Sequence, residues 1–285
     1  MNTTPTTHRH AFSHMLTQQT ALPTGPADKN GFFPWNLLYY GVSSTVDTQT
    51  VEYGEAWREL SHVLESICRA DASAGISPIP LICFEGLPGA GKSTQIARVQ
   101  AACEEVYGRG CFIDPPSGSV IGRMLRTLYA DAALRNRMRR DTPWLTPLLF
   151  SADLRLAVRH AVEQGATYAL VDRGILSTYF YNLAAYSEDF EEAWAAMQPH
   201  MVAFYRPTVT VFLDVDVQVA HERVVRRRRG ELRKMDMPEQ MLKDRTLLMN
   251  CQDRLPEVPF CRIDGAQRQE AVTAEIMACL AGYLS

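Results

Sequence analysis

Short, unbroken apolar runs alternate with amphipathic stretches from residue 79 to the end of the chain. The run 81–84 is flanked by turn residues, as expected for a strand buried on both faces. Four further runs predict strands at 111–114, 168–171, 208–213 and 261–263. Helices are predicted between them at 94–103, 120–129, 131–141, 148–164, 177–205 (interrupted near Pro199), 217–229, 238–254 and 269–283. Pro143 and Pro147 are expected to break the chain before the helix at 148. Alternating strands and helices predict an α/β fold, with a parallel sheet covered by helices on both faces.

The first 78 residues have a different pattern. Residues 1–30 are polar and lack periodicity, which predicts a mobile tail. An aromatic cluster follows at 31–40, and we expect it to pack onto the domain or a second subunit rather than to bind a ligand. Apolar residues at helical spacing predict one helix over 55–70. The predicted division is therefore an N-terminal extension, 1–78, and a catalytic domain, 79–285.

Residues 86–93 read G-x-x-x-x-G-K-S between the first predicted strand and the following helix. In such a loop, the backbone N–H groups surround a phosphate, Lys92 adds a positive charge, and the Ser93 hydroxyl can bind Mg²⁺. The helix N-terminus favours the same anion. The context predicts a site for a nucleoside triphosphate, ATP with Mg²⁺, in a three-layer sandwich of the P-loop NTPase type. The residues expected to bind the cofactor are Gly86, Gly89, Ala90, Gly91, Lys92, Ser93 and Thr94.

Asp172 and Arg173 come directly after the predicted strand 168–171. Asp172 occupies the place of an acid that binds Mg²⁺ directly or through water, although it could instead cap the next turn. An arginine at such a strand end is costly unless it faces an anion, so Arg173 is a candidate for an acceptor phosphate. The loops after residues 84, 113, 171 and 213 all lie at the carboxyl ends of parallel strands, where ligands bind. We therefore expect one shared site.

A basic run spans residues 222–234 and contains six arginines. It has no interleaved aromatic residues, which disfavours nucleic-acid binding. A lid over the triphosphate, at about 223–237, explains the run better because it would bring arginines to the transferred phosphoryl group. Arg227 and Arg229 are the candidates, although spacing alone does not choose between lid arginines. The arginine-rich segment 131–141 is either a solvated face or lies near phosphate.

Composition adds little about partners, since the net charge is −3 and 46% of the residues are hydrophobic. Seven scattered cysteines without a C-x-x-C pair suit free thiols in a reducing cytoplasm. No secretory signal and no apolar run of membrane-spanning length are apparent. We therefore expect a cytoplasmic protein with no membrane partner.

With these motifs identified, the chain from residue 79 onward resembles the thymidylate kinase family of nucleoside monophosphate kinases. The likeness lies in Glu-Gly-Leu-Pro-Gly-Ala-Gly-Lys-Ser-Thr-Gln at 85–95, Leu-Leu-Phe-Ser-Ala-Asp at 148–153, Asp-Arg-Gly at 172–174 with Leu-Ser-Thr at 176–178, Arg-Gly-Glu-Leu at 229–232 and Ile-Asp-Gly-Ala at 263–266. The resemblance implies that Phe150 stacks on an acceptor base and Arg173 grips the acceptor phosphate. It further implies that the lid arginines supply catalysis and that Gly265 lies near the donor adenine. Ser177 and Tyr181 are also expected at the acceptor, and a homodimer is expected through the helices after Leu148 and Ser177.

Departures from the family pattern fall mostly on the acceptor side. Pro88 replaces a loop acid, Ile113 stands at an arginine position, and Gly174 replaces an aromatic residue. Leu154 occupies the place of a base-reading arginine, with Arg155 one residue away as the candidate substitute. The donor half therefore matches the family, and the acceptor half differs from it.

Three functions remain open from the sequence. The first is an ATP-dependent kinase of a nucleotide, most closely resembling a dTMP kinase. The second is a kinase of a nucleoside or other small molecule, in which Asp114 removes the proton from the acceptor hydroxyl. The third is a non-catalytic NTP-binding module. The acceptor is a small molecule in both kinase readings, and no nucleic acid is expected.

Overall fold

The computed structural model describes residues 59, 76–141, 145–186, 189–197, 205–227, 231–256 and 258–284. Contacts divide the chain into two units, Met1–Asp47 and Thr48–Ser285. The tail, the aromatic cluster at 31–40 and, apart from Glu59, the helix predicted over 55–70 lie outside the described residues. The domain boundary near residue 79 stays a prediction.

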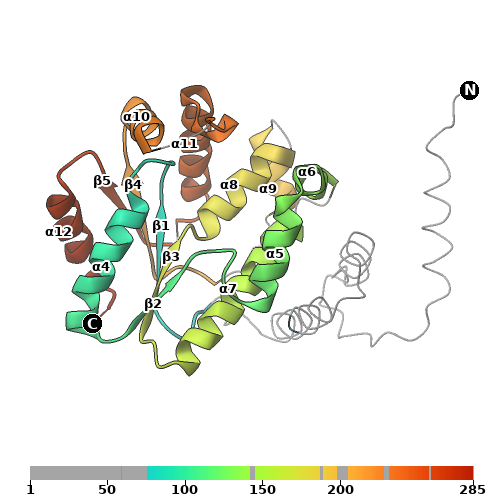
Figure 1. The fold of residues 1–285 in the computed structure, drawn as a ribbon. Coiled ribbons are helices and arrows are strands. Elements are labelled where there is room, and N and C mark those ends of the chain that lie inside the picture. Colours follow the sequence, from blue (N-terminus) through green and yellow to red (C-terminus); the bar gives the residue numbers. More distant parts are fainter. Residues whose placement is uncertain are drawn as a thin grey trace, which may run out of the picture. The chain divides into compact units, whose positions relative to one another are not determined.

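Five parallel strands form one sheet in the order β2-β3-β1-β4-β5. Each coincides with a predicted apolar run to within a few residues. All residues of the central strand β1 are buried, because helices cover both faces of the sheet (Figure 1). The strands are β1 (Leu81–Glu85), β2 (Gly110–Ile113), β3 (Tyr168–Asp172), β4 (Val209–Asp214) and β5 (Phe260–Asp264).

The helices follow the predicted alternation with two corrections. The region predicted as helical over 177–205 is divided earlier than Pro199: α8 ends at Tyr186 and α9 begins at Phe190, where Asp189 caps the new helix by accepting the N–H groups of Glu191 and Glu192. Pro147 lies inside the first turn of α7 rather than before the helix, since N–H groups in a first turn have no intrahelical partner to lose. The interruption predicted near Pro199 lies outside the described residues. The helices are α4 (Lys92–Tyr107), α5 (Val120–Ala130), α6 (Ala132–Asp141), α7 (Leu145–Glu163), α8 (Ile175–Tyr186), α9 (Phe190–Met197), α10 (Val217–Arg227), α11 (Pro238–Asp253), α12 (Gln269–Leu280) and a short 3₁₀ helix, η3 (Lys234–Asp236).

Alternate residues of β1 enter two separate cores. Ile82 and Phe84 pack with apolar residues of α4, α10 and α12. Leu81 and Cys83 pack on the opposite face, with Leu154 and other apolar residues of α7 and β3. This alternation follows from the two-residue period of a strand. It fixes the sheet between its two helical layers and therefore fixes the direction in which the strand ends point.

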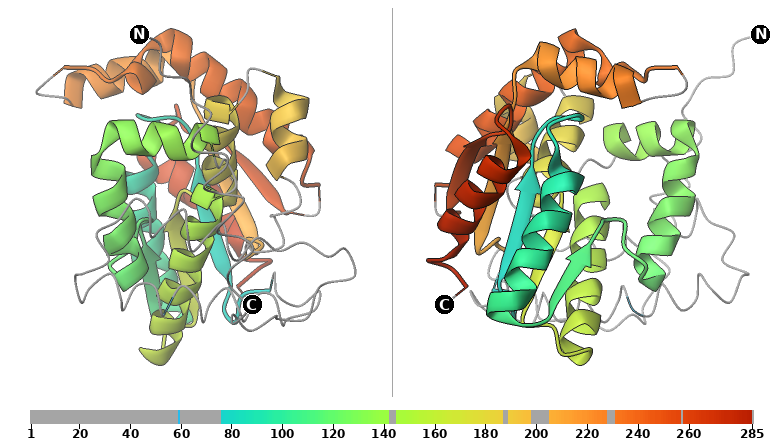
Figure 2. Two further views of the ribbon diagram at one scale, coloured as in Figure 1. Left: turned by 90° about the vertical axis from the view of Figure 1, so that its right-hand side faces the viewer. Right: turned by 60° about the vertical axis from the view of Figure 1, so that its left-hand side comes forward.

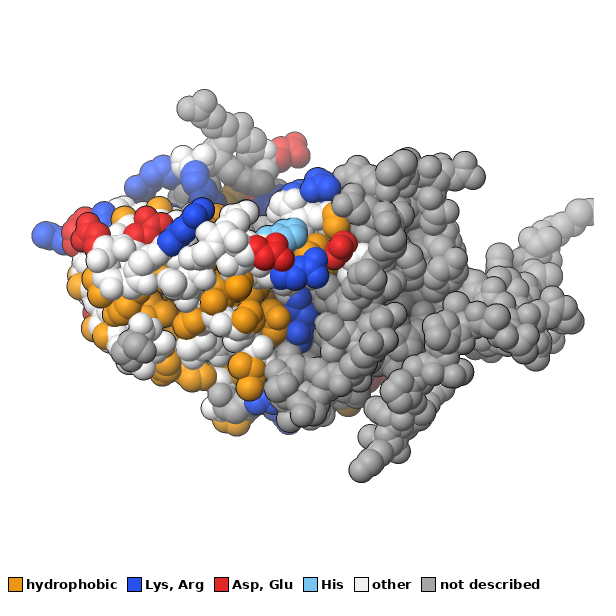
Figure 3. All heavy atoms as spheres, turned by 90° about the horizontal axis from the view of Figure 1, so that it is seen from below, with side chains coloured by type: hydrophobic (Ala, Val, Ile, Leu, Met, Phe, Trp, Pro, Cys, Tyr) orange, Lys and Arg blue, Asp and Glu red, His pale blue; other side chains and the backbone are white. Residues whose placement is uncertain are grey.

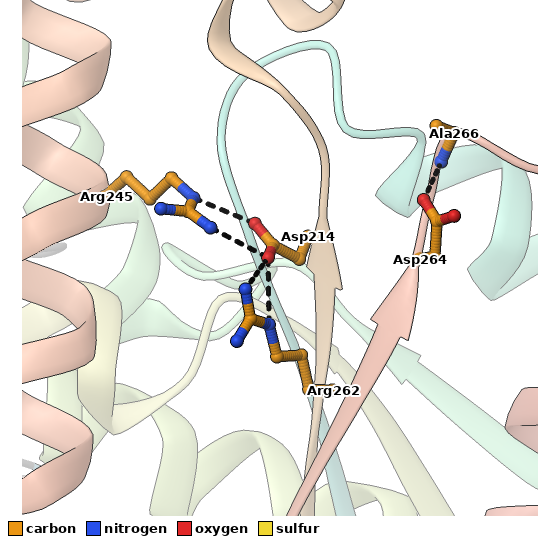
Figure 4. A network of polar contacts seen from close by, with 5 residues as sticks. All are labelled: Asp214, Arg245, Arg262, Asp264 and Ala266. Atoms are coloured by element: carbon orange, nitrogen blue, oxygen red, sulfur yellow. Dashed lines mark hydrogen bonds and ion pairs between the residues drawn. The ribbon is translucent and has the colours of Figure 1, made fainter.

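Helices α10 and α11 lie across the end of the sheet where the carboxyl ends of the strands emerge (Figure 2). Asp214 at the end of β4 binds α11 there: Nε and Nη2 of Arg245 each donate to its carboxylate at 2.8 Å. Arg262 of β5 donates to the same carboxylate through Nε at 2.8 Å (Figure 4). Burial raises the pKa of Asp214, but the hydrogen bonds from the two arginines outweigh burial and hold it below its usual range.

The structure corrects the expectation that all cysteines are free thiols. Cys261 of β5 and Cys279 of α12 form a disulfide, with their Cα atoms 6.7 Å apart. Their separation of 18 residues hides the pairing in the sequence, and only the packing of α12 beside β5 brings them together. Within the described ranges, no helix is both long and apolar enough to cross a membrane.

Replacing Asp214 with Asn should lower the free energy of unfolding by about 1.5–3 kcal/mol, the cost expected for losing hydrogen bonds to charged groups. Asp264 is the matched control, because it is the neighbour of Asp214 in the sheet register and accepts only the N–H of its own loop residue Ala266, at 2.9 Å, among the bonds drawn in Figure 4. Urea unfolding of Asp214→Asn and Asp264→Asn measures the difference.

A pH series checks the origin of this loss. A carboxylate with a lowered folded-state pKa stabilises the protein above its unfolded pKa, and the stabilisation disappears as the pH falls through the folded pKa. The gap between wild type and Asp214→Asn should therefore shrink on acidification. Equal losses in the two variants at neutral pH would contradict the role given to Asp214.

Candidate active site

Residues 86–91 form a tight turn between β1 and α4. Gly86, Gly89 and Gly91 have φ angles of 139°, 82° and 99°, which favour glycine. A Cβ on Gly89 would lie 2.3 Å from the carbonyl oxygen of Ala220 in α10, so a larger residue has no room. Ala90 closes the turn by donating its N–H to Leu87 O at 3.1 Å. The loop therefore has the conformation that a phosphate cradle requires, directly before the N-terminus of α4.

Lys92 folds back over this loop. Its Nζ donates to the carbonyl oxygens of Gly86 at 3.2 Å and Leu87 at 3.3 Å, and the residue is buried. The pKa of Lys92 is lowered to about 7, mainly by burial and also by the charges of Arg173 and Arg227, against the opposite effect of nearby Asp172 and Glu85. A buried ammonium with carbonyl partners alone is poorly compensated. An anion in the loop would stabilise its charged form.

Ser93 and Asp172 lie next to each other at the adjacent ends of α4 and β3. Ser93 Oγ donates to Asp172 Oδ2 at 3.4 Å. Asp172 Oδ1 is buried and has no hydrogen-bond partner among the described residues. A hydroxyl and a half-buried carboxylate with one oxygen not hydrogen-bonded suit Mg²⁺, which prefers few protein oxygens together with phosphates and water. These residues fit the ion that the sequence predicts for them.

Arg173 is the only described residue other than glycine with a positive φ, 73°. Such a conformation costs about 1–3 kcal/mol and is typical of functional positions. The backbone N–H of Arg173 donates to Phe84 O at 3.0 Å, which fixes its peptide beside β1. Its guanidinium donates to Ser177 Oγ at 3.2 Å and lies 5.7 Å from the ring centroid of Tyr181. Three predicted acceptor residues, Arg173, Ser177 and Tyr181, are therefore neighbours.

Glu85 is a site residue for which the sequence analysis predicted no role. It is fully buried, and its Oε1 accepts the N–H groups of Gly174 at 2.9 Å and Ser177 at 3.0 Å. The Ser177 hydroxyl also donates to this carboxylate. Burial raises the pKa of Glu85, while its hydrogen bonds and the charge of Arg173 act in the opposite direction. In the sequence, the signal for this role is an acidic residue at the end of an otherwise apolar strand.

Asp114 follows β2 and is exposed. Partial loss of hydration of its carboxyl group and the charge of Asp172 raise the pKa of Asp114, against the opposite effects of Arg126 and Arg173. Ile113 pairs with Val171 in the parallel register of β2 and β3, so Asp114 and Asp172 lie at the same end of neighbouring strands. The convergence predicted for the loops after β1, β2 and β3 thus appears in the geometry.

Phe150 and Arg155, both on α7, have different surroundings. Phe150 is half-buried, and its ring meets Tyr129 edge-on with centroids 5.5 Å apart. The Arg155 guanidinium instead lies 4.1 Å from the ring centroid of Tyr205, beside a pocket of about 260 Å³ that Pro78 also lines. Pro78 and Tyr205 precede β1 and β4, so Arg155 lies near the amino ends of the strands, the end viewed in Figure 3. This position corrects the prediction that Arg155 contacts the acceptor.

The structure describes part of the segment predicted to be a lid, 223–237. Arg227 ends α10 close enough to Lys92 to lower its pKa, whereas Arg229 lies outside the described residues. Arg223 donates to Gly265 O at 3.0 Å, and the N–H of Gly265 donates to Asp214 O at 2.8 Å. A Cβ on Gly265 would lie 2.7 Å from Val215 Cγ2, so a larger residue at this position would require a shift of its neighbours. The loop after β5 is therefore fixed beside α10.

Residues 84–276 match the sequence model of the family described as "Thymidylate kinase". The chain belongs to the thymidylate kinase family. A probable thymidylate kinase of Methanothermobacter thermautotrophicus is 30% identical over 142 residues, which cover 50% of this chain and 68% of the relative. A probable thymidylate kinase of Pyrobaculum aerophilum is 28% identical over 201 residues, covering 68% and 93% of the two chains.

A third relative, the thymidylate kinase of Geobacillus thermodenitrificans, is 27% identical over 154 residues, covering 54% of this chain and 68% of its own length. The family matches confirm the resemblance and the α/β kinase fold expected from the sequence. Membership in the thymidylate kinase family indicates a nucleotide-binding phosphotransferase. The family match begins at residue 84 and leaves the N-terminal extension outside it.

The lowered pKa of Lys92 predicts a pH-dependent affinity for a nucleoside triphosphate. Phosphate favours the charged ammonium, so binding above pH 7 should take up close to one proton. The affinity for the magnesium complex of a non-hydrolysable ATP analogue should then fall by about tenfold per pH unit between roughly pH 7.5 and 9. Titration calorimetry in two buffers of different ionisation enthalpy measures the proton uptake directly. Lys92→Met should bind weakly and lose this uptake, and identical uptake by both proteins would show that another group titrates.

Proposed function

We propose that this member of the thymidylate kinase family transfers a phosphoryl group from ATP, with Mg²⁺, to a (deoxy)nucleoside monophosphate resembling dTMP. The observation that supports this proposal most is the position of Arg173. It is held in a left-handed backbone conformation next to Asp172, and its charge helps to lower the pKa of Lys92. A cation built into a strained turn at the end of a strand suits a second phosphate, next to the one in the loop. Donor and acceptor phosphates would then meet at the shared strand ends.

In this proposal, the loop amides of Gly86, Gly89, Ala90 and Gly91 and the start of α4, including Thr94, bind the donor phosphates together with Lys92. Ser93 and Asp172 hold Mg²⁺, which neutralises charge on the phosphates when it is bound. Gly265 lies at the donor adenine.

Arg227, together with Arg229, brings positive charge to the migrating phosphoryl group. On the acceptor side, Phe150 stacks on the base, Ser177 and Tyr181 support Arg173, and Asp114 faces the sugar or phosphate. A homodimer through α7 and α8 belongs to the same proposal.

Two positions on the proposed acceptor side, Leu154 and Gly174, differ from the family pattern and affect how a base could be recognised. Leu154, at the position of a base-reading arginine, is buried in the core on the α7 face of the sheet. Gly174 sits where a Cβ would come within 2.6 Å of Cys83 Sγ, so an aromatic residue is excluded there without rearrangement of β1. We therefore propose that recognition of the base depends less on charged side chains here than the family pattern implies.

A second candidate is phosphorylation of a nucleoside hydroxyl with Asp114 as general base. The raised pKa of Asp114 favours this candidate, because a base works best when its pKa lies nearer to the working pH. In that reaction Arg173 would pair with Asp114 or with the donor. The two candidates differ in which substitution removes catalysis.

A panel of nucleoside monophosphates, deoxynucleoside monophosphates and their parent nucleosides, with Mg·ATP, tests the proposal by ADP release. For a monophosphate kinase, Arg173→Met should lower kcat/KM for the acceptor by about 100-fold or more, since charge-assisted bonds to phosphate are strong. Asp114→Asn should then affect KM more than kcat.

For a nucleoside kinase, Asp114→Asn should instead lower kcat by about 100-fold or more, and only the nucleosides should turn over. Arg98→Met is a matched arginine control, because Arg98 pairs with Thr273 and Glu270 on α12, away from the acceptor residues. Tight ATP-analogue binding with no turnover on any acceptor would indicate a non-catalytic NTP-binding module.

A further inference from the structure

A buried carboxylate on α7 organises the loop that follows β2. Asp153 is fully buried, and its Oδ2 accepts the backbone N–H of Ser117 at 2.7 Å. Its Oδ1 accepts the hydroxyls of Ser117 at 2.6 Å and Ser119 at 2.7 Å. Three donors from one short loop thus converge on a single side chain. Satisfying a buried carboxylate in this way makes the loop conformation costly to change.

The same loop is fastened from its other side and at its end. Arg126 of α5 donates through Nη2 to Ser117 O at 2.7 Å. Ser119 is the N-cap of α5, with Oγ accepting the N–H of Gly122 at 2.9 Å. A Cβ on Gly122 would lie 2.7 Å from Asp153 Oδ1, so the helix start also fits closely against the carboxylate. The loop, α5 and α7 therefore form one unit around Asp153.

This unit contains two of the predicted acceptor residues. Asp114 begins the loop, and Phe150 lies three residues before Asp153, one turn earlier on α7. The Phe150 ring in turn meets Tyr129 of α5. Asp153 thus connects the residue expected at the sugar or phosphate to the residue expected at the base.

We propose that Asp153 is a positioning residue for the acceptor, which sets the distance between Asp114 and Phe150 by holding the 114–119 loop to α7. The inference rests on the proposed function, because it assigns the same two residues to the acceptor. Asp153 itself is fully buried behind the loop and acts through hydrogen bonds rather than by touching the acceptor. The hydrogen bonds of Asp153 described above involve no residue of the proposed donor site, so a substitution at Asp153 should leave ATP binding unchanged.

The test compares Asp153→Ala and Asp153→Asn with wild type, using dTMP and Mg·ATP as substrates. Asp153→Ala leaves three donors unpaired and should raise the KM for dTMP by about tenfold or more, while the KM for ATP stays within about twofold. Asn keeps one oxygen for the Ser117 N–H, and its amide can donate to the rotatable hydroxyls. Asp153→Asn should therefore stay within about threefold of wild type for dTMP.

Val158→Ala is the matched control, because Val158 is also fully buried on α7 but packs with the sheet core rather than the loop. It should lower stability and leave the KM for dTMP unchanged. An unchanged KM in Asp153→Ala, or the same rise in both Ala variants, would overturn the proposal. If Asn were as damaging as Ala, the negative charge rather than the hydrogen bonding would matter, and the positioning role would also be overturned.

Hydrogen exchange separates this inference from the proposed function. Without any substrate, the amides of Ser117 and Gly122 should exchange at least about tenfold faster in Asp153→Ala than in wild type or Val158→Ala. If wild type fails to phosphorylate dTMP, the proposed acceptor is wrong, and the exchange rates still decide whether Asp153 holds the loop. Unchanged exchange in Asp153→Ala would overturn the inference in either case.

Discussion

The hydrogen bonds of the Glu85 carboxylate are the contact on which the candidate site depends most. Glu85 ends the central strand, and it fixes the turn that follows the neighbouring strand β3 through the N–H groups of Gly174 and Ser177. That turn presents Asp172 and Arg173. Because a buried carboxylate is costly without partners, any displacement of the turn leaves Glu85 unsatisfied. One side chain thus couples the start of the phosphate loop to the residues expected at Mg²⁺ and at the acceptor.

The same device occurs at three strand ends. Glu85 binds the turn after β3, Asp214 binds arginines of α11 and β5, and Asp153 on α7 binds the loop after β2. In each case a carboxylate with little exposure adds directional hydrogen bonds to a loop, strand or helix at this end of the sheet. Hydrogen bonds to charged groups have defined geometry, whereas apolar packing tolerates small shifts. The interior of the sheet is therefore held by apolar packing and its functional edge by directional bonds.

The two halves of the site differ in how they are built. The donor half depends on backbone conformation, with glycines at positive φ packed against α10 and a lysine folded over their carbonyls. The proposed acceptor half depends on side chains from the loops after β2 and β3 and from α5, α7 and α8, which meet only through tertiary contacts. A backbone-built cradle is encoded by a short local motif. A site assembled from several elements can change one residue at a time, which agrees with departures from the family pattern concentrated there.

The sequence alone determined the order of the elements, the parallel sheet and the phosphate loop, because strand burial and the glycine-rich turn are encoded within a few adjacent residues. It also predicted that Asp172 and Arg173 lie at the carboxyl end of a strand, which the structure confirms. Tertiary structure decided the role of Glu85 and the Asp153 cluster, the direction of Arg155 toward Tyr205, and the Cys261–Cys279 pair. Each joins residues that lie far apart along the chain. Hydrophobic periodicity reports which face of an element is buried, but not which polar partner it meets there.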